Sequence, residues 1–415
     1  MLKNILQLMT GNGLAQLIQF ASIPILTQFY SPENFGLLAL AIAISGILAV
    51  ISSLQLHVGL VTLKSTRAVN QLLAAGFVLN ALMVIISLLL IFIADAFIYN
   101  HELSLFFIFL VVLNTFFSSV NNLLKGVYVY SGTFSTLSTV LIIRAISIVT
   151  LQFYFAWQFT ENVTQYGLVL GLLFGEFVLF LLIGFNKIKV RDVLTIKVFK
   201  RLSFFFKKLK AFIVYGTPQE LVSVAIFWMP LVIISATLGE EIAGQYSISA
   251  RILWPATILV TGSIAQVLYH RMVNMPIENL IEMIFFRAYF KLIYIPLALL
   301  AYYISPFIFE LVLNDTWQEA KNISKYVALL CVIFLYALPY RVVYRVLKIQ
   351  KMLLIIEILT LCVLILITAL VDYKTIDDLL RLLVLLGVFQ SILLEYFCRK
   401  SLLVKIKKIK VMSNV

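Results

Sequence analysis

The residues best able to do chemistry are four charged side chains deep within apolar segments: Arg144, Glu176, Glu220 and Arg251. A charge at the centre of a bilayer costs about 2.5–3.5 kcal/mol on insertion scales, so each needs a partner or a function. Because consecutive segments run antiparallel, Arg144 should meet Glu176, and Glu220 should meet Arg251. Two interpretations stay open: ion pairs that fix adjacent helices, or charges of a wet cavity in which Glu220 or Glu176 binds a proton or another cation.

A second group consists of basic residues at helical spacing near the ends of apolar segments. Arg341, Arg345 and Lys348 occur at i, i+4 and i+7, which places them on one helical face. Related pairs are Lys64 with Arg67 and Arg287 with Lys291. Arginine binds phosphate through two parallel hydrogen bonds, so a vestibule ringed by these residues suits a diphosphate group. The alternative is snorkelling of long basic side chains to the membrane surface.

Uncharged polar residues form a third, weaker set. Gln16 and Gln19 share one face of an otherwise apolar helix and could line a path for a sugar, although amides also bond between helices. His57 is either a cavity residue or an interior residue with its hydrogen bonds satisfied, and the second interpretation is favoured. The remaining histidines, His101 and His270, are scattered, and no metal site is predicted. The three cysteines are expected to be buried apolar residues without ligand spacing: Cys331, Cys362 and Cys398.

The elements that position these residues must be membrane-spanning helices. Hydrophobic residues make up 62% of the chain and charged residues 12%, which is too apolar for a soluble domain of 415 residues. Each span needs about 20 apolar residues. Breaks in hydropathy predict twelve spans, at 8–30, 37–62, 71–95, 104–125, 136–157, 164–186, 211–238, 243–269, 285–308, 325–348, 352–371 and 379–399.

Charge placement predicts the orientation of these spans. Most of the 32 Lys and Arg fall in alternate loops, and most acids fall in the opposite loops. By the positive-inside rule, both termini are expected in the cytoplasm, in agreement with an even number of spans. The net charge of +13 therefore reflects membrane topology, and nucleic-acid binding is not expected.

A repeated segment indicates an internal duplication. Residues 24–37 recur in weakened form at 230–245, with Glu33 and Gly36 corresponding to Glu241 and Gly244. An even split of this kind predicts two six-helix lobes related by a pseudo-twofold axis along the membrane normal. We expect an N-terminal lobe at 1–186, a basic cytoplasmic loop at 187–210, a C-terminal lobe at 211–399 and a basic tail at 400–415. The loop at 187–210 is either an amphipathic surface helix or a tether.

The chain resembles the Wzx-type flippases of lipid-linked O-antigen units, in the polysaccharide-transport branch of the multidrug/oligosaccharidyl-lipid/polysaccharide exporter superfamily. The resemblance covers the whole chain. It depends on G-L-A-Q-L-I-Q-F-A-S-I-P-I-L-T-Q-F-Y-S-P-E-N-F-G, residues 13–36, and on G-Q-Y-S-I-S-A-R-I-L-W-P, residues 244–255. Residues 54–61, L-Q-L-H-V-G-L-V, depart from the many relatives that carry an acidic residue there.

The resemblance implies transport of undecaprenyl-diphosphate oligosaccharides from the inner to the outer leaflet of the bacterial inner membrane, for lipopolysaccharide or other polysaccharide biosynthesis. It implies alternating access about a partly cationic cavity, with Arg144, Arg251 and Glu220 as candidate cavity charges. No cofactor is expected beyond coupling to H⁺ or Na⁺. A polysaccharide polymerase and a chain-length regulator are possible partners.

Two other functions remain as alternatives. A drug or metabolite antiporter of the same superfamily would bind organic cations in an acid-rich cavity, whereas the embedded charges here lean basic. A membrane enzyme acting on lipid-linked sugars would need a nucleophile with a base, or a metal-ligand cluster, and larger outer loops. The sequence offers neither, so we do not expect an enzyme.

Overall fold

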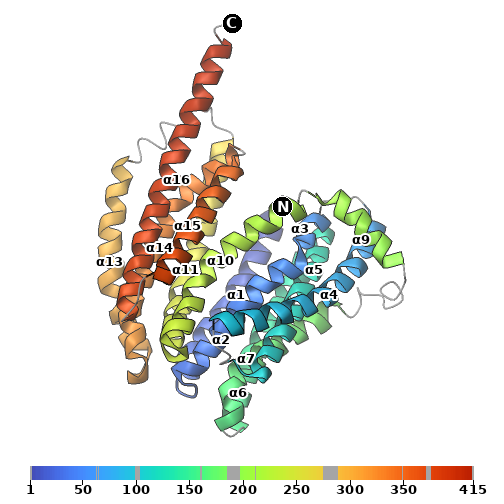
Figure 1. Ribbon diagram of the computed structural model, residues 1–415, viewed down its shortest axis with the longest axis vertical. Coiled ribbons are helices and arrows are strands. Elements are labelled where there is room, and N and C mark those ends of the chain that lie inside the picture. The colour runs from blue at the N-terminus through green and yellow to red at the C-terminus, as the bar shows by residue number, and fades with distance from the viewer. Residues whose placement is uncertain are drawn as a thin grey trace. The chain divides into compact units, whose positions relative to one another are not determined.

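The computed structural model describes residues 2–413 apart from 62, 64, 99–102, 159–160, 185–196, 211, 274–287, 348 and 371–374. Every regular element within this part of the chain is a helix (Figure 1). Each of the twelve predicted spans coincides with a helix, one of them broken. These helices are α1 (Leu2–Leu26), α2 (Pro32–Ser53) with α3 (Leu56–Val61), α4 (Thr66–Ile98), α5 (Leu105–Ser131), α6 (Phe134–Gln158), α7 (Glu161–Gly184), α10 (Thr217–Leu238), α11 (Glu240–Val273), α13 (Ala288–Val312), α14 (Gln318–Val346), α15 (Gln350–Leu370) and α16 (Ile376–Ser413).

The length and composition of these helices fit a bilayer. Ten of the described helices are long and apolar enough to span one. Many large apolar side chains point outward from them, such as Ile85 and Leu89 on α4 and Leu385 on α16. Lipid is a favourable environment for such apolar side chains, whereas exposing them to water is unfavourable. The predicted all-α membrane fold is therefore confirmed.

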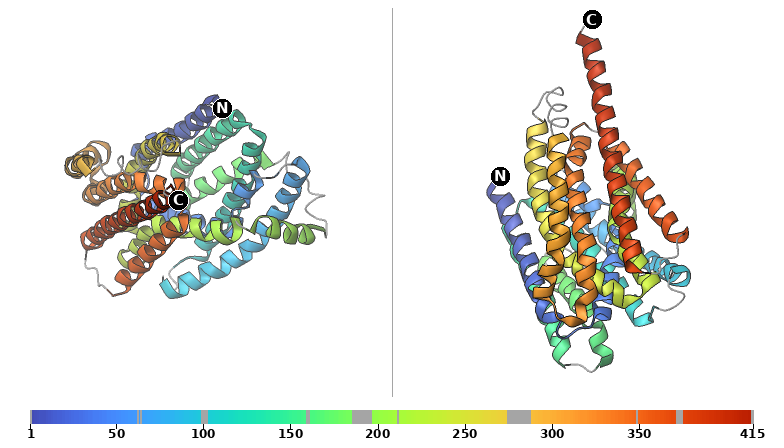
Figure 2. Two further views of the ribbon diagram at one scale, coloured as in Figure 1. Left: turned by 90° about the horizontal axis from the view of Figure 1, so that it is seen from above. Right: turned by 90° about the vertical axis from the view of Figure 1, so that its left-hand side faces the viewer.

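The described chain forms two compact units, residues 1–244 and 245–415. In the first unit, α6 packs against α1 and α7, and α2 packs against α5 and α10. In the second, α14 packs against both α13 and α16 (Figure 2). Packing thus groups α10 with the first unit, although its sequence belongs to the second half of the repeat. The lobe boundaries derived from the repeat describe the duplication, and they remain a prediction.

The segment between the halves and the C-terminus both contain helix. Residues 197–208 form α9 (Lys197–Lys208), as expected for an amphipathic helix in the basic loop. It packs on α4, with Phe205 buried and Lys207 and Lys208 exposed. At the other end, α16 continues into the predicted basic tail as far as Ser413 and extends beyond its neighbours in the second unit (Figure 2).

The second predicted span is not one continuous helix. Leu54 and Gln55 have φ angles of 44° and 52°, and they separate α2 from α3. A π-helical turn, η1 (Phe212–Gly216), precedes α10 and contacts α3. These two irregular segments lie within the first unit, beside the polar residues described next.

Candidate functional site

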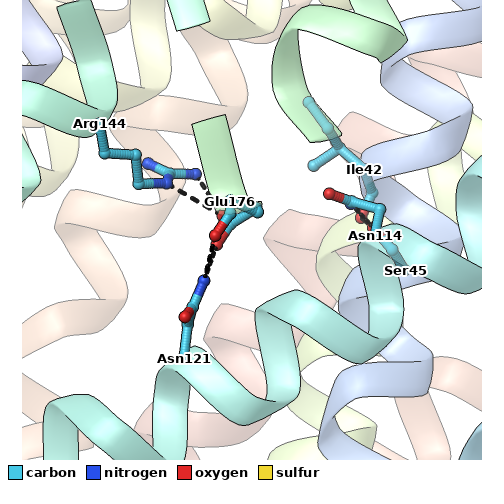
Figure 3. Close-up of polar contacts among 6 residues, drawn as sticks. All are labelled: Ile42, Ser45, Asn114, Asn121, Arg144 and Glu176. Carbon is cyan, nitrogen blue, oxygen red and sulfur yellow. Dashed lines mark hydrogen bonds and ion pairs between the residues drawn. The ribbon is translucent and has the colours of Figure 1, made fainter. Parts of the chain in front are cut away.

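Glu176 lies at the centre of a polar cluster inside the first unit (Figure 3). Arg144 on α6 donates from Nε and Nη2 to Glu176 Oε1 at 3.0 and 2.5 Å. Asn121 on α5 donates from Nδ2 to Glu176 Oε2 at 2.7 Å and to the Glu176 carbonyl oxygen at 2.9 Å. Glu176 is 7% exposed. The predicted pairing of Arg144 with Glu176 is confirmed, and three helices meet at one carboxylate.

A second cation belongs to this cluster. Lys125 interacts electrostatically with both Glu176 and Arg144. The predicted span 104–125 ends at Lys125, whereas α5 continues to Ser131, so Lys125 lies inside the helix. Arg144 thus pairs directly with Glu176, whereas Lys125 acts on both through electrostatics alone, and the three residues hold two basic groups and one acid.

The face of α5 that carries Lys125 is polar along its length. Asn114 donates from Nδ2 to Ser45 Oγ at 2.8 Å, and Ser45 donates in turn to the Ile42 carbonyl at 3.3 Å (Figure 3). Within the described residues, Asn114 Oδ1 and Asn121 Oδ1 are buried without a hydrogen bond. Asn114 and Asn121 are at i and i+7, a spacing that could have identified this polar face from the sequence.

Glu220, the other predicted cation site, lies on the first turn of α10. Its Oε2 is buried and has no hydrogen-bond partner among the described residues. The expected partner, Arg251, is half-buried on α11 in the second unit. That pairing stays a prediction, since it would join the two units. Within the first unit, the nearby titratable group that interacts with Glu220 is His57.

Two further ion pairs, each with a buried acid, lie within the described part of the second unit. Arg341 Nη1 lies 3.1 Å from Glu357 Oε1 of α15, and the Arg341 guanidinium carbon lies 5.6 Å from the Phe334 ring centroid. Arg399 Nη2 lies 2.6 Å from Glu395 Oε1, and Tyr336 donates a short hydrogen bond to Glu395 Oε2. Sequence reasoning missed both acids, because each lies close to a span end, where a carboxylate is common and needs no buried partner.

Several predicted site residues receive less support from the structure. Arg345 and Lys291 lie on α14 and α13, but their side chains are outside the described set, as are Lys64 and Arg287 altogether. Gln16 is exposed and Gln19 half-buried on α1. A glycan-lining role for these two residues stays a prediction.

Two expectations about buried residues were wrong. His57 Nδ1 is buried without a hydrogen-bond partner in the described structure, so the imidazole is not satisfied. Cys362 is exposed on α15, whereas Cys331 and Cys398 are buried as expected. A thiol is apolar enough to face lipid, which explains why hydropathy could not assign its side. No group of three His, Cys, Asp or Glu that could hold a metal ion occurs among the described residues.

Solved structures with a similar fold are membrane transporters. One is an inward-facing multidrug resistance MATE family transporter of the MOP superfamily, at 14% identity, with a TM-score of 0.61 and 96% of each chain covered. Another is a MOP superfamily transporter from Pyrococcus furiosus, at 12% identity, with a TM-score of 0.54 and 96% of this chain and 95% of that chain covered. A search of curated proteins found no match.

The fold defines the class in structural terms: a polytopic helical membrane protein with the fold of the MOP transporters. Within that class, the family model for polysaccharide biosynthesis proteins matches residues 1–275. The chain belongs to this family. This match confirms the resemblance to the polysaccharide-transport branch of the exporter superfamily. Membership in the Wzx subtype stays a prediction.

Proposed function

We propose that this protein flips polyprenyl-diphosphate-linked oligosaccharides, such as undecaprenyl-diphosphate O-antigen units, from the inner to the outer leaflet by alternating access. The observation that carries this proposal is the positive excess in the interior of the first unit, where Arg144 and Lys125 share Glu176. A buried basic excess attracts an anionic group, because Coulomb attraction is screened less there than in water. A diphosphate supplies such a group.

The basic residues of the second unit give the headgroup a first contact. Arg341 is 26% exposed at its side chain, whereas Glu357 is 2% exposed. The guanidinium can therefore reach a ligand from its exposed edge while Glu357 holds the other edge. Arg345, Arg287 and Lys291 would extend this contact, and Arg251 would receive the headgroup deeper in the membrane. Lys64 would offer the headgroup a further basic group within the first unit. The glycan passes between the lobes while the polyprenyl chain stays in lipid.

A cation gradient drives the cycle in this proposal. Glu176 already accepts hydrogen bonds from Arg144 and Asn121, which hold it as a carboxylate. Glu220 has a buried oxygen with no hydrogen-bond partner in the described structure, so it is the better candidate to bind a proton or Na⁺. Binding there would bias the balance between inward-open and outward-open states.

The proposed setting is the bacterial inner membrane, with both termini in the cytoplasm. A polysaccharide polymerase and a chain-length regulator would act on the product in the outer leaflet. The antiporter alternative has a weaker physical basis, because an organic cation would be repelled by the positive excess around Arg144 and Lys125.

Reconstitution into liposomes tests the proposal. A fluorescent polyprenyl-diphosphate oligosaccharide should change leaflet with the wild-type protein, and a fluorescent organic cation should not. Arg251→Ala and Arg341→Ala should each slow flipping at least about tenfold, the loss expected when a charged hydrogen bond of about 1.5–3 kcal/mol is removed. Transport of the organic cation, with no movement of the lipid, would replace the flippase by the antiporter. Normal flipping by both variants would reject a cationic headgroup site.

A further inference from the structure

The break between α2 and α3 is a costly feature within the first unit. Leu54 and Gln55 are consecutive non-glycine residues with φ of 44° and 52°. Left-handed conformations at such residues cost on the order of 1–3 kcal/mol each and persist only when the surroundings hold them. Because the series of helical backbone hydrogen bonds is interrupted there, carbonyl groups at the end of α2 also lack helical partners. In a membrane, such irregular backbone is tolerated where protein surrounds it or where it lines a polar cavity.

Two neighbouring segments approach the break closely, one against its backbone and one against a side chain. Gly126 of α5 lies against His57, so that a Cβ at this glycine would be 2.9 Å from the His57 carbonyl oxygen. Gly216, the last residue of the π-helical turn, lies against Gln55, whose Oε1 would overlap a Cβ there. These contacts bring the start of α10, with Thr217 and Glu220, beside the break.

Polar atoms without partners gather in the same place. Ser52 Oγ and His57 Nδ1 flank the break in sequence, and Thr217 Oγ1 and Glu220 Oε2 lie on the first turn of α10. All four atoms are buried and have no hydrogen-bond partner among the described residues. An unsatisfied buried polar atom costs about 1–3 kcal/mol. Four such atoms near one helix break indicate a ligand or water rather than a packing defect.

The charges around His57 restrict what that ligand can be. His57 interacts electrostatically with Glu220 from α10 and with Lys125 from α5. Beyond Lys125 lie Glu176 on α7 and Arg144 on α6. Leu209, which follows α9, lies beside Gly59, whereas Lys207 and Lys208 at the end of α9 are exposed. Lys125 disfavours a metal cation such as Na⁺ and Glu220 disfavours an anion, so of the two coupling cations considered above the proton fits this site better. A proton needs only one acceptor atom and no coordination shell.

We propose that His57 and Glu220 form a proton-binding site at the break between α2 and α3. Imidazole is the side chain whose ordinary titration falls in the physiological range. Uptake of one proton from water at Nδ1 gives an imidazolium whose charge is balanced by the Glu220 carboxylate. Release of that proton leaves the carboxylate unbalanced beside a strained turn. Protonation therefore stabilises the contact between the break and the start of α10, and deprotonation weakens it.

Nuclear magnetic resonance of labelled histidine in nanodiscs tests the site directly. The chain has three histidines, so His101→Gln with His270→Gln leaves His57 as the one imidazole signal. In this background, Glu220→Gln should lower the titration midpoint of His57 by about one pH unit or more, because a nearby carboxylate favours the imidazolium. Lys125→Met should raise it. Glu33→Gln, at an exposed position on the first turn of α2, is the matched control and should leave it unchanged.

An unchanged midpoint in Glu220→Gln, or equal shifts in Glu220→Gln and Glu33→Gln, overturns the proposal. If Glu220→Gln fails to fold, an unchanged or lowered midpoint in Lys125→Met overturns it in the same way. The link from this site to transport rests on the proposed function. The titration uses no substrate, so a wild-type protein that flips no lipid would reject the flippase and leave the proton site intact.

Discussion

Gly36 and Gly244 lie in reciprocal contact, each against the backbone of the other copy of the repeat. A Cβ on Gly36 would overlap the carbonyl oxygen of Glu240, and a Cβ on Gly244 would overlap the carbonyl oxygen of Pro32. Pro32 corresponds to Glu240 in the repeat as Gly36 corresponds to Gly244. The contact is therefore symmetric, as a duplicated motif that pairs with itself requires. The glycines recognised from their spacing are the points of closest approach.

The first prediction concerns this contact. Gly36→Ala and Gly244→Ala should each lower the free energy of unfolding by about 1–3 kcal/mol, the usual cost of overpacking, because backbone cannot retreat as a side chain can. Thermal unfolding in detergent or nanodiscs measures this. Gly13→Ala is the control, since nothing lies within 4 Å of a Cβ there. Equal melting of all three variants would show that the close approach is not needed.

The second prediction concerns the pair Arg144–Glu176. Arg144→Met should destabilise the protein by about 3–5 kcal/mol, because Glu176 is left buried with Asn121 and Lys125 alone. Replacing both members, as Arg144→Met with Glu176→Leu, should recover part of that loss, since no uncompensated carboxylate remains although Lys125 then lacks its acid. Unfolding of the single and double variants checks the cycle. Additive losses would mean that the two side chains are not coupled.

The third prediction concerns Arg341. Because its guanidinium is partly exposed beside buried Glu357, Arg341→Lys should weaken binding of a diphosphate lipid, since lysine cannot form the two parallel hydrogen bonds. A loss of about tenfold in affinity is expected, measured with the lipid in nanodiscs. Lys321→Ala is the control, because Lys321 pairs with Glu310 in an exposed bridge that contributes little. Equal affinity for Arg341→Lys and the wild type would exclude Arg341 from headgroup binding.

The sequence predicted the spans better than the partners within them. Each of the twelve spans expected from hydropathy coincides with a helix in the described part of the chain, because apolar composition over about 20 residues is a strong signal. Matched depth was enough to pair Arg144 with Glu176, since both lie well inside their helices. Lys125 was misplaced because α5 continues past the expected span end to Ser131.

Contacts that depend on three dimensions were harder to predict. The break at Leu54 and Gln55 contains no glycine or proline, so the local sequence does not predict it. Its cost is offset by segments distant in the chain, at Gly126 and Gly216. For the same reason, the unsatisfied nitrogen of His57 could not be anticipated. Whether a side chain is buried follows from composition. Whether its polar atoms find hydrogen-bond partners depends on which helices surround it.

The fourth prediction tests whether the positive excess in the first unit binds substrate. Asn121→Asp places a second carboxylate beside Glu176 and one helical turn from Lys125, which neutralises the excess without removing a basic residue. Some loss of stability is expected, because the new carboxylate cannot donate to Glu176 as Asn121 does, and Arg144 and Lys125 limit that loss by pairing with one acid each. Affinity for a diphosphate lipid should fall about tenfold or more, since its attraction to the cluster is lost.

Asn122→Asp is the matched control for this added negative charge. It adds the same charge one residue further along α5, where the side chain projects about 100° away around the helix. Binding of the lipid is measured for both variants in nanodiscs, with thermal unfolding as a check on the fold. A loss confined to Asn121→Asp identifies the cluster around Glu176 as the anion-attracting site. Equal losses in both variants would instead mean that the overall charge of the helix matters, and the cluster would then be a structural ion pair.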